Sequence, residues 1–145
     1  MTSFVLDASV AAKWMLPAQG ELLRTEAFRL LDAYGAGEVN LVVPDIFWAE
    51  CGNIVWKAVR QKRLDQATAQ LELDSLMRRD LPTVSSLQLL QEAVTIAFDF
   101  GRSVYDCLYV ALAARAKKQL ITADERLANA LAARFPVKWL GALNL

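Results

Sequence analysis

Short apolar runs alternate along this chain with longer segments in which apolar residues recur every three or four positions. The two patterns have different periods, and each predicts a different element. The short runs predict β-strands, because they are brief and are bounded by polar residues, glycine or proline. The expected strands are Ser3–Leu6, Leu41–Val43, Pro82–Ser85, Gln119–Thr122 and Val137–Leu140.

The longer segments predict amphipathic or buried α-helices. In one of them Leu23, Ala27, Leu30 and Leu31 follow the spacing of a single helical face. The expected helices are Ala8–Leu16, Glu21–Tyr34, Asp45–Gln61, Asp65–Arg78, Ser86–Phe100, Ser103–Lys118 and Asp124–Arg134. Strands that alternate with helices predict the α/β class, with a parallel sheet whose faces are covered by helices.

The length and composition are typical of one globular domain, expected to span residues 1–145. Apolar residues make up 55% of the chain and charged residues 22%, which argues against a disordered protein. The longest apolar run, Cys107–Ala114, is too short to span a bilayer. The first residues also lack a basic segment followed by a long apolar one, so we expect a cytoplasmic protein without a signal peptide.

The most useful feature of the composition is the absence of histidine. It excludes Ser-His-Asp and Cys-His catalysis, and it argues against a catalytic zinc site. A hydrolase would then depend on carboxylates and a hard cation. The net charge of zero gives no support to nucleic-acid binding, but an acidic metal site can offset a basic groove in this sum. Cys51 and Cys107 are expected to be small buried side chains.

Four acids are candidates for a site, and each also has a structural interpretation. Asp7 follows the first expected strand and could only cap the next helix. Glu50 lies on the flank of the apolar stripe of its helix, where a semi-buried role and an ordinary edge position are equally compatible with the pattern. Neither residue identifies a site by itself.

The other two acids are similar. Asp106 enters a helix that is apolar on nearly every face, where a carboxylate needs partners or a metal, although a capping box with Ser103 is an equal alternative. Asp124 follows the fourth expected strand and could be a cap, or could follow a capping box formed by Thr122 and Glu125.

Considered together, the acids indicate more than capping. Asp7, Asp106 and Asp124 lie near strand ends or helix starts, and Glu50 can reach the same crevice. In open α/β sheets, sites form at the carboxyl ends of the strands. Carboxylates that share a crevice repel one another and need divalent cations. Such a cation lowers the pKa of a bound water and neutralises phosphate charge, which is the chemistry of phosphodiester hydrolysis.

Several motifs, in this order and spacing, resemble those of the PIN-domain ribonucleases, especially the VapC-type toxins of toxin–antitoxin pairs. They are Leu6–Val10 with Lys13-Trp14, Val43–Asp45 leading to Glu50, Tyr105-Asp106 leading to Tyr109–Ala113, and Leu120–Asp124 leading to Leu127. The resemblance covers nearly the whole chain. It implies a three-layer fold with a central, mostly parallel sheet flanked by helices.

The resemblance also implies a function. The acidic quartet would be Asp7, Glu50, Asp106 and Asp124, binding Mg²⁺ or Mn²⁺, with Asp7 and Asp106 as the central ligands. The supporting hydroxyls would be those of Ser9 and Thr122. The protein would cleave RNA as a magnesium-dependent endoribonuclease, would form a homodimer, and would be held inactive by a small antitoxin protein.

Other positions are weaker candidates. Lys13 could contact a phosphate, although a solvated surface lysine is the more ordinary interpretation. A basic cluster could follow an RNA strand or could only end a helix; it consists of Lys57, Arg60, Lys62 and Arg63. Three of the four tryptophans, Trp14, Trp48 and Trp56, could line a partner interface or pack in the core. We expect core packing for Trp48.

Of four alternatives, the sequence argues against two and leaves two open. A haloacid-dehalogenase-like phosphatase needs a second acid two residues after the first, where this chain has Ser9, and a receiver domain needs an acidic pair that is absent. A PIN-type nuclease that is not a toxin is compatible with the same residues. A non-catalytic α/β binding module would use all four acids as caps, and it would not bring them to one cleft.

Overall fold

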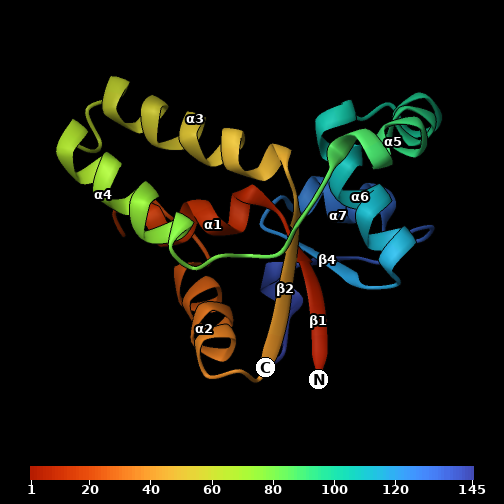
Figure 1. The fold of residues 1–145 in the computed structure, drawn as a ribbon, viewed down its shortest axis with the longest axis horizontal. Helices are drawn as coiled ribbons and strands as arrows, with labels where there is room; N and C mark the ends of the chain where they lie inside the picture. Colours follow the sequence, from red (N-terminus) through yellow and green to blue (C-terminus); the bar gives the residue numbers. More distant parts are fainter.

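A computed structural model describes all residues, 1–145, and contains one sheet of five parallel strands in the order β3-β2-β1-β4-β5 (Figure 1). The strands are β1 (Thr2–Leu6), β2 (Val39–Pro44), β3 (Thr83–Val84), β4 (Gln119–Thr122) and β5 (Val137–Trp139). All five strands were predicted from the sequence, and so was their parallel direction.

Seven α-helices connect the strands, and all seven were predicted. They are α1 (Ala8–Met15), α2 (Arg24–Gly35), α3 (Ile46–Arg60), α4 (Gln66–Met77), α5 (Ser86–Phe100), α6 (Val104–Ala116) and α7 (Glu125–Leu131), with a short 3₁₀ helix η1 (Leu140–Ala142) after β5. None of the helices has the length and apolar character that crossing a membrane requires.

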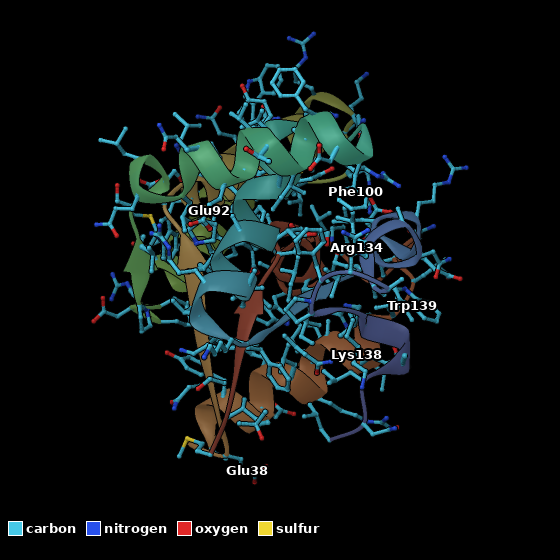
Figure 2. All side chains as sticks on the ribbon, turned by 90° about the vertical axis from the view of Figure 1, so that its right-hand side faces the viewer. Glu38, Glu92, Phe100, Arg134, Lys138 and Trp139 are labelled. Carbon is cyan, nitrogen blue, oxygen red and sulfur yellow. The ribbon has the colours of Figure 1, made fainter.

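Helices cover both faces of the sheet, which confirms the predicted three-layer α/β fold. On one face α6 packs against β1, β2 and β4, and α5 lies outside α6 (Figure 2). On the other face α1 and α2 lie against the sheet, and α3 and α4 pack on α1 (Figure 1). Because α6 is packed between the sheet and α5, most of its side chains are buried, which explains why the helix is apolar on nearly every face.

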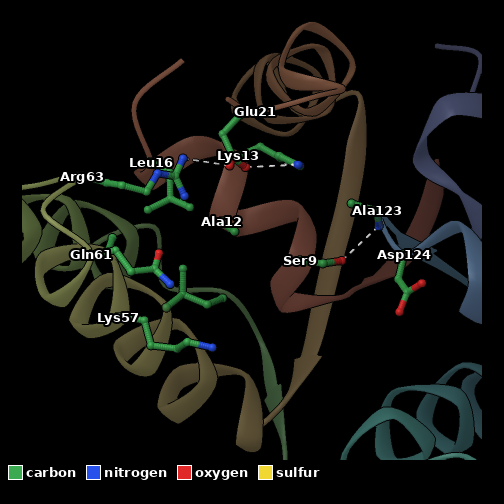
Figure 3. A pocket seen from close by; sticks show the side chains of 12 residues that line it. Ser9, Ala12, Lys13, Leu16, Glu21, Lys57, Gln61, Arg63, Ala123 and Asp124 are labelled. Carbon is green, nitrogen blue, oxygen red and sulfur yellow. Dashed lines mark hydrogen bonds and ion pairs between the residues drawn. The ribbon is translucent and has the colours of Figure 1, made fainter. Parts of the chain in front are cut away.

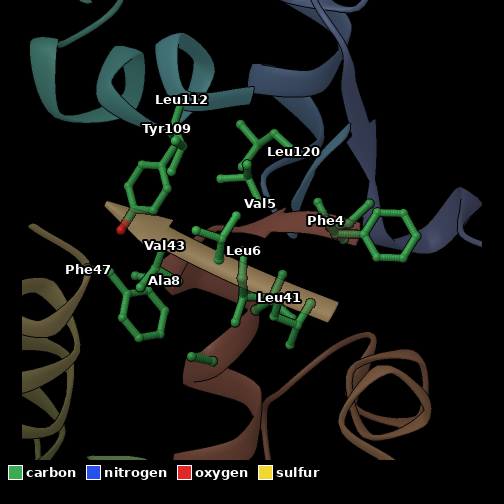
Figure 4. Close-up of a cluster of buried hydrophobic side chains, with 14 of the residues drawn as sticks. Phe4, Val5, Leu6, Ala8, Leu41, Val43, Phe47, Tyr109, Leu112 and Leu120 are labelled. Atoms are coloured by element: carbon green, nitrogen blue, oxygen red, sulfur yellow. The ribbon is translucent and has the colours of Figure 1, made fainter. Parts of the chain in front are cut away.

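The core lies between the sheet and these inner helices. Val5 and Leu6 of β1 are fully buried because β1 has a strand on either side and helices on both faces (Figure 4). Leu112 of α6 meets the sheet from one side, and Phe47 of α3 lies beyond the end of β2. Both free cysteines, Cys51 and Cys107, are buried, as predicted.

The start of α2 differs from the prediction. The apolar spacing predicts a helix from Glu21, but α2 begins at Arg24. Leu23 has a left-handed backbone (φ 60°), which interrupts a right-handed helix at this point. The carboxylate of Glu21 is held by Lys13 and Arg63, contacts that no local pattern indicates.

The end of α7 also differs. The helix was predicted to reach Arg134, but it ends at Leu131, and a turn follows. Pro136 explains why no helix continues toward β5, because the ring of a proline disfavours the helical conformation at the residue before it, here Phe135.

The order of the strands reverses at one place in the sheet. From β1 the chain builds outward to β2 and β3, and then returns across to β4 and β5 on the other side. The order therefore reverses between β1 and β4. In open α/β sheets the carboxyl ends of the strands at such a reversal form a crevice in which ligands bind.

Candidate active site

Asp7 occupies this crevice, directly after the carboxyl end of β1. It is the N-cap residue of α1 by position, but its side chain makes no capping hydrogen bond. Instead Oδ2 accepts hydrogen bonds from Ser9 Oγ at 2.6 Å and from Thr122 Oγ1 at 2.7 Å. The structural interpretation of Asp7 as only a cap is therefore wrong. The side chain is only 8% exposed, and Oδ1 has no protein partner.

Two hydroxyls fix the orientation of this carboxylate. Ser9 Oγ also accepts a hydrogen bond from the backbone N–H of Ala123 at 3.0 Å, and Thr122 Oγ1 accepts one from the N–H of Asp124 at 3.0 Å. Each hydroxyl thus accepts a hydrogen bond from a backbone N–H after β4 and donates a hydrogen bond to Asp7. These bonds join the ends of β1 and β4, and Thr122 is fully buried.

Asp124 stands at the same end of β4 and has a double role. Its Oδ1 accepts a hydrogen bond from the N–H of Leu127 at 3.2 Å, so it caps α7, as one of the two capping interpretations holds. The capping box of Thr122 with Glu125 is absent, because Thr122 Oγ1 is engaged with Asp7 and with the N–H of Asp124. The capping bond uses only one of the two carboxylate oxygens of Asp124.

Asp106 approaches the crevice from the first turn of α6. Ser103 caps this helix by accepting the backbone N–H of Asp106 at 3.1 Å, which is the serine half of the capping box considered for this pair. The side chain is half-buried, and burial is the main cause that raises the pKa of Asp106. The charge of Asp124 raises the pKa further, whereas the charge of Arg102 and a hydrogen bond from Ser103 lower it.

Glu50 comes from α3 and is held by a residue that the sequence did not single out. Its Oε1 accepts a hydrogen bond from the Tyr109 hydroxyl at 2.6 Å. Tyr109 is 1% exposed and lies one helical turn after Asp106 on α6 (Figure 4). A tyrosine inside an otherwise apolar helix needs a partner for its hydroxyl, and this was the available signal. The partner lies on another helix, so its identity depends on the tertiary structure.

The carboxylates act on one another electrostatically. Burial raises the pKa of Asp7, against the hydrogen bonds from its two hydroxyls, and the charges of Asp106 and Asp124 raise it further. Burial also raises the pKa of Glu50, against the Tyr109 hydrogen bond, and Asp7 and Asp106 add to the shift. These shifts link each of the four acids to at least one other, so the acids share one region at the carboxyl ends of the strands.

The structure does not contain a closed set of metal ligands. No three Asp, Glu, Cys or His side chains are placed so that they hold one ion as they stand. The chemistry of the four acids nevertheless fits a hard divalent cation, because all their donors are oxygens. The pKa values of Asp7, Glu50 and Asp106 are raised, first by burial and then by the charges of neighbouring acids. Asp124 caps α7, and Asp106 lies in the capped first turn of α6, but neither Asp7 nor Glu50 makes a capping bond. The binding-module alternative, in which all four acids are caps, leaves these two acids unexplained.

The weaker candidates have varied surroundings. Lys13 Nζ lies 3.1 Å from Glu21 Oε1, so this lysine is engaged in an ion pair and is not a freely solvated side chain. Trp14 is buried, and its Nε1 donates to the carbonyl of Ala27 at 2.8 Å, so the prediction that it could line an interface is wrong. Trp56, in contrast, is 55% exposed.

Trp48 has the packing role that we expected. It lies against the core and meets the ring of Phe47 edge-on, with 5.0 Å between the ring centroids. Its Nε1 donates to Thr83 Oγ1 at 3.0 Å, which ties the start of α3 to β3.

Comparison with known proteins agrees with this geometry. The family model of the PIN domain matches residues 4–131. The chain belongs to the PIN-domain family. A relative from Pyrobaculum aerophilum, described as Ribonuclease VapC3, is 33% identical over 127 residues, which are 86% of this chain and 92% of the relative. The family resemblance in the sequence motifs is thereby confirmed.

Solved structures share the fold of this PIN-domain protein at low sequence identity. The crystal structure of PAE2754 from Pyrobaculum aerophilum has a TM-score of 0.66 and 20% identity, covering 97% of this chain and 85% of that one. VapBC2 from Rickettsia felis, bound to a promoter DNA fragment, has a TM-score of 0.65 and 14% identity, covering 95% and 98%. A toxin–antitoxin complex from Klebsiella pneumoniae has a TM-score of 0.60 and 17% identity, covering 92% and 94%.

Proposed function

We propose that this PIN-domain protein is a metal-dependent endoribonuclease that hydrolyses RNA phosphodiester bonds in the cytoplasm, as the toxin of a toxin–antitoxin pair. The observation that carries the proposal is the group of four acids at the reversal of strand order, three of which have a raised pKa. The 33% identical relative described as Ribonuclease VapC3 supports the substrate class.

The roles of the residues follow from their contacts. Asp7, Glu50, Asp106 and Asp124 would hold Mg²⁺ or Mn²⁺, which supplies positive charge to a phosphate oxygen and activates water. Burial near other acids makes the charged carboxylates costly without a cation, so the site is suited to bind one.

Three uncharged side chains position the acids. Ser9 and Thr122 orient Asp7 by donating to the same oxygen, which leaves its other oxygen available to the cation. Tyr109 positions Glu50 from the far side of the crevice. Because these donors are held by packing or by backbone N–H groups, the orientation is set before any ligand arrives.

The direct test is cleavage of a single-stranded RNA labelled at one end. Wild-type protein should cleave in Mg²⁺ or Mn²⁺, should lose activity in EDTA, and should regain it when the cation is restored. Asp106→Asn should lose at least about two orders of magnitude in rate, since it removes a charge that the cation needs. The matched control is Asp99→Asn, an exposed aspartate of α5 outside the site.

Two results would refute the ribonuclease proposal. Full activity of wild-type protein in excess EDTA would exclude the metal-dependent mechanism. Equal activity of Asp106→Asn and wild type, at matched purity and thermal stability, would remove the acids from the reaction.

The proposed antitoxin partner rests on a separate observation. Two of the structurally similar proteins are VapBC2 and a toxin–antitoxin complex. A cationic side chain from a partner, placed beside Asp7 and Asp106, would take the electrostatic place of the metal. We expect the protein to be harmful when expressed alone and harmless with the product of a short neighbouring gene that co-purifies with it. Harmless expression without any small partner would refute the toxin role while leaving the nuclease intact.

We also propose a homodimer, formed through the outer face of α5. Leu87, Leu90 and Phe98 of this helix are 80%, 41% and 85% exposed, and Val94 lies between them at helical spacing. Such an apolar stripe on the outermost helix is unfavourable in water unless it is covered. Phe98→Glu should convert a dimer to a monomer in sedimentation experiments. A wild-type protein that sediments as a monomer would refute this proposal.

A further inference from the structure

A groove between α1 and α3 reaches Asp124, one of the four acids (Figure 3). Its volume is about 420 Å³, within the range of small-molecule sites, which is about 300–1,000 Å³. Ser9, Ala123 and Asp124 form its end toward the acids, so the groove and the candidate active site are continuous. A ligand bound in this groove would touch the metal-binding region.

The floor of the groove is apolar. Ala12, Leu16 and Ala58 form a small buried cluster that is separate from the main core, and Ile54 packs against it. All four side chains line the groove. This cluster joins α1 to α3 and is buried, and the half-buried Ile54 gives the floor most of its aliphatic surface. A small apolar surface of this kind can accept the flat face of a nucleobase.

Two polar side chains of α3 have no partner in the protein. Lys57 and Gln61 are exposed, stand one turn apart, and make no side-chain hydrogen bond or ion pair. Figure 3 shows both directed from α3 into the groove, toward α1. A cation and an amide above an apolar floor are the groups that bind a phosphate and the edge of a base.

The remaining charges of the groove are already engaged. Glu21 accepts from Lys13 Nζ at 3.1 Å and from Arg63 Nη2 at 3.0 Å (Figure 3). The Glu21 side chain is 11% exposed, so this pair of contacts is a fixed part of the wall. Lys57 is therefore the one cation of the groove that is free to meet a ligand.

We propose that this groove is a nucleotide subsite next to the scissile phosphate, and that Gln61 determines which base is preferred there. The base lies on the aliphatic floor, the Gln61 amide hydrogen-bonds to its edge, and Lys57 neutralises the adjacent phosphate. The proposal rests on the proposed ribonuclease function, which supplies the RNA strand. It assigns cleavage preference to a residue that lies outside the metal-binding acids.

The chemistry of the groove favours a nucleotide over a partner helix. A docked amphipathic helix needs a continuous apolar channel for side chains on successive turns. Here the apolar floor is a small patch of four side chains, bordered on both sides by charged or amide groups. Lined by three cations and two acids, the groove is positive on balance in a chain whose net charge is zero.

The test uses a short single-stranded RNA randomised at every position, with two readouts. Cleavage products of wild type and Gln61→Ala are sequenced to give the base frequencies beside the cut. Affinity for the same labelled RNA is measured in EDTA, so that binding is followed without cleavage. Controls are Gln70→Ala, an exposed amide of α4, and Lys118→Ala, a lysine directly before the amino end of β4, at the opposite end of the strands from the acids.

Gln61→Ala should reduce the preference for one base at a single position by about fivefold or more, while the overall rate changes less. Lys57→Ala should weaken RNA binding by about five- to tenfold without altering the preference, because a phosphate contact carries no sequence information. Both side chains are exposed, so all variants should keep the wild-type melting temperature.

The failure of this inference is distinguishable from failure of the ribonuclease proposal. Two results together would overturn the subsite while wild-type cleavage stands. They are unchanged base frequencies in Gln61→Ala, and RNA binding by Lys57→Ala that is no weaker than that of Lys118→Ala. The groove would then be available to a protein segment. A protein that does not cleave RNA, but binds it in a manner dependent on Lys57, would retain the subsite and overturn the nuclease.

Discussion

Binding of a divalent cation should change the thermal stability of this protein, and Asp106 decides by how much. Without metal, Asp7, Glu50 and Asp106 have raised pKa values, so their charged forms destabilise the folded state at neutral pH. A cation that binds only the folded state removes this repulsion and adds its own binding free energy. Asp106→Asn removes both one source of repulsion and one ligand.

The expected size follows from linkage and from the length of the chain. A cation at about one hundred times its dissociation constant stabilises the folded state by about 2.7 kcal/mol. A domain of roughly this length gains about 2–4 °C in melting temperature for each kcal/mol. Saturating Mn²⁺ should therefore raise the wild-type melting temperature by roughly 5–11 °C. Asp106→Asn should lose most of this rise, yet in EDTA it should melt no lower than wild type.

The unchanged or higher stability of metal-free Asp106→Asn is the distinctive part. The capping bond of α6 uses the backbone N–H of Asp106 and the Ser103 hydroxyl, so the substitution leaves this bond in place. A structural role for the carboxylate would instead lower the melting temperature in EDTA. Differential scanning fluorimetry of wild type, Asp106→Asn and Asp99→Asn, with Mn²⁺ and with EDTA, separates the two. An equal Mn²⁺ response in Asp106→Asn and wild type would refute this account.

Three further outcomes are expected. Tyr109→Phe removes the hydrogen bond to Glu50, and should lower stability by about 1–2 kcal/mol and raise the Mg²⁺ concentration for half-maximal cleavage; an unchanged Mg²⁺ requirement would limit Tyr109 to packing. Thr122→Val, at a fully buried position, should cost about 1–3 kcal/mol in denaturant titrations, whereas Thr122→Ser should restore most of it. In EDTA the raised pKa values of Asp7, Glu50 and Asp106 should stabilise the folded state fully below the ordinary carboxyl pKa values of 3.8 and 4.5, and this contribution should be lost as pH rises through the raised folded-state values. Melting temperature should therefore fall less steeply with pH in Asp106→Asn than in wild type, and an equal dependence in both would contradict this.

Local periodicity determined the elements of this fold. A strand or helix buries a face whose spacing is visible in a short window, so Ser3–Leu6 and Asp45–Gln61 were recognisable without their neighbours. Where a long-range contact competes with local spacing, the prediction was wrong. Leu22 and Leu23 have the spacing of a helix, but Glu21 is held by Lys13 and Arg63, and α2 begins only at Arg24.

The tryptophans show the same limit. Trp14 and Trp56 lie in similar apolar contexts, and the sequence did not separate core from surface for either. The structure buries Trp14 beneath α2, with a hydrogen bond to Ala27, and leaves Trp56 on the exposed side of α3. Which side of a helix is covered depends on the packing of other helices, and this information is not local.

The sequence by itself determined the α/β class and made the four acids candidates, because strand ends, helix starts and the absence of histidine are features of short segments or of composition. The order and spacing of its motifs, by their resemblance to the PIN-domain ribonucleases, indicated the family. Only the tertiary structure decided how these acids are supported. Thr122 meets Asp7 across 115 positions and Tyr109 meets Glu50 across 59, through hydrogen bonds of 2.7 and 2.6 Å. Such bonds depend on the distance between side chains in space, and spacing along the chain does not express that distance. The adjacency of β1 and β4 fixes it for the first pair, and the packing that brings α3 near α6 fixes it for the second.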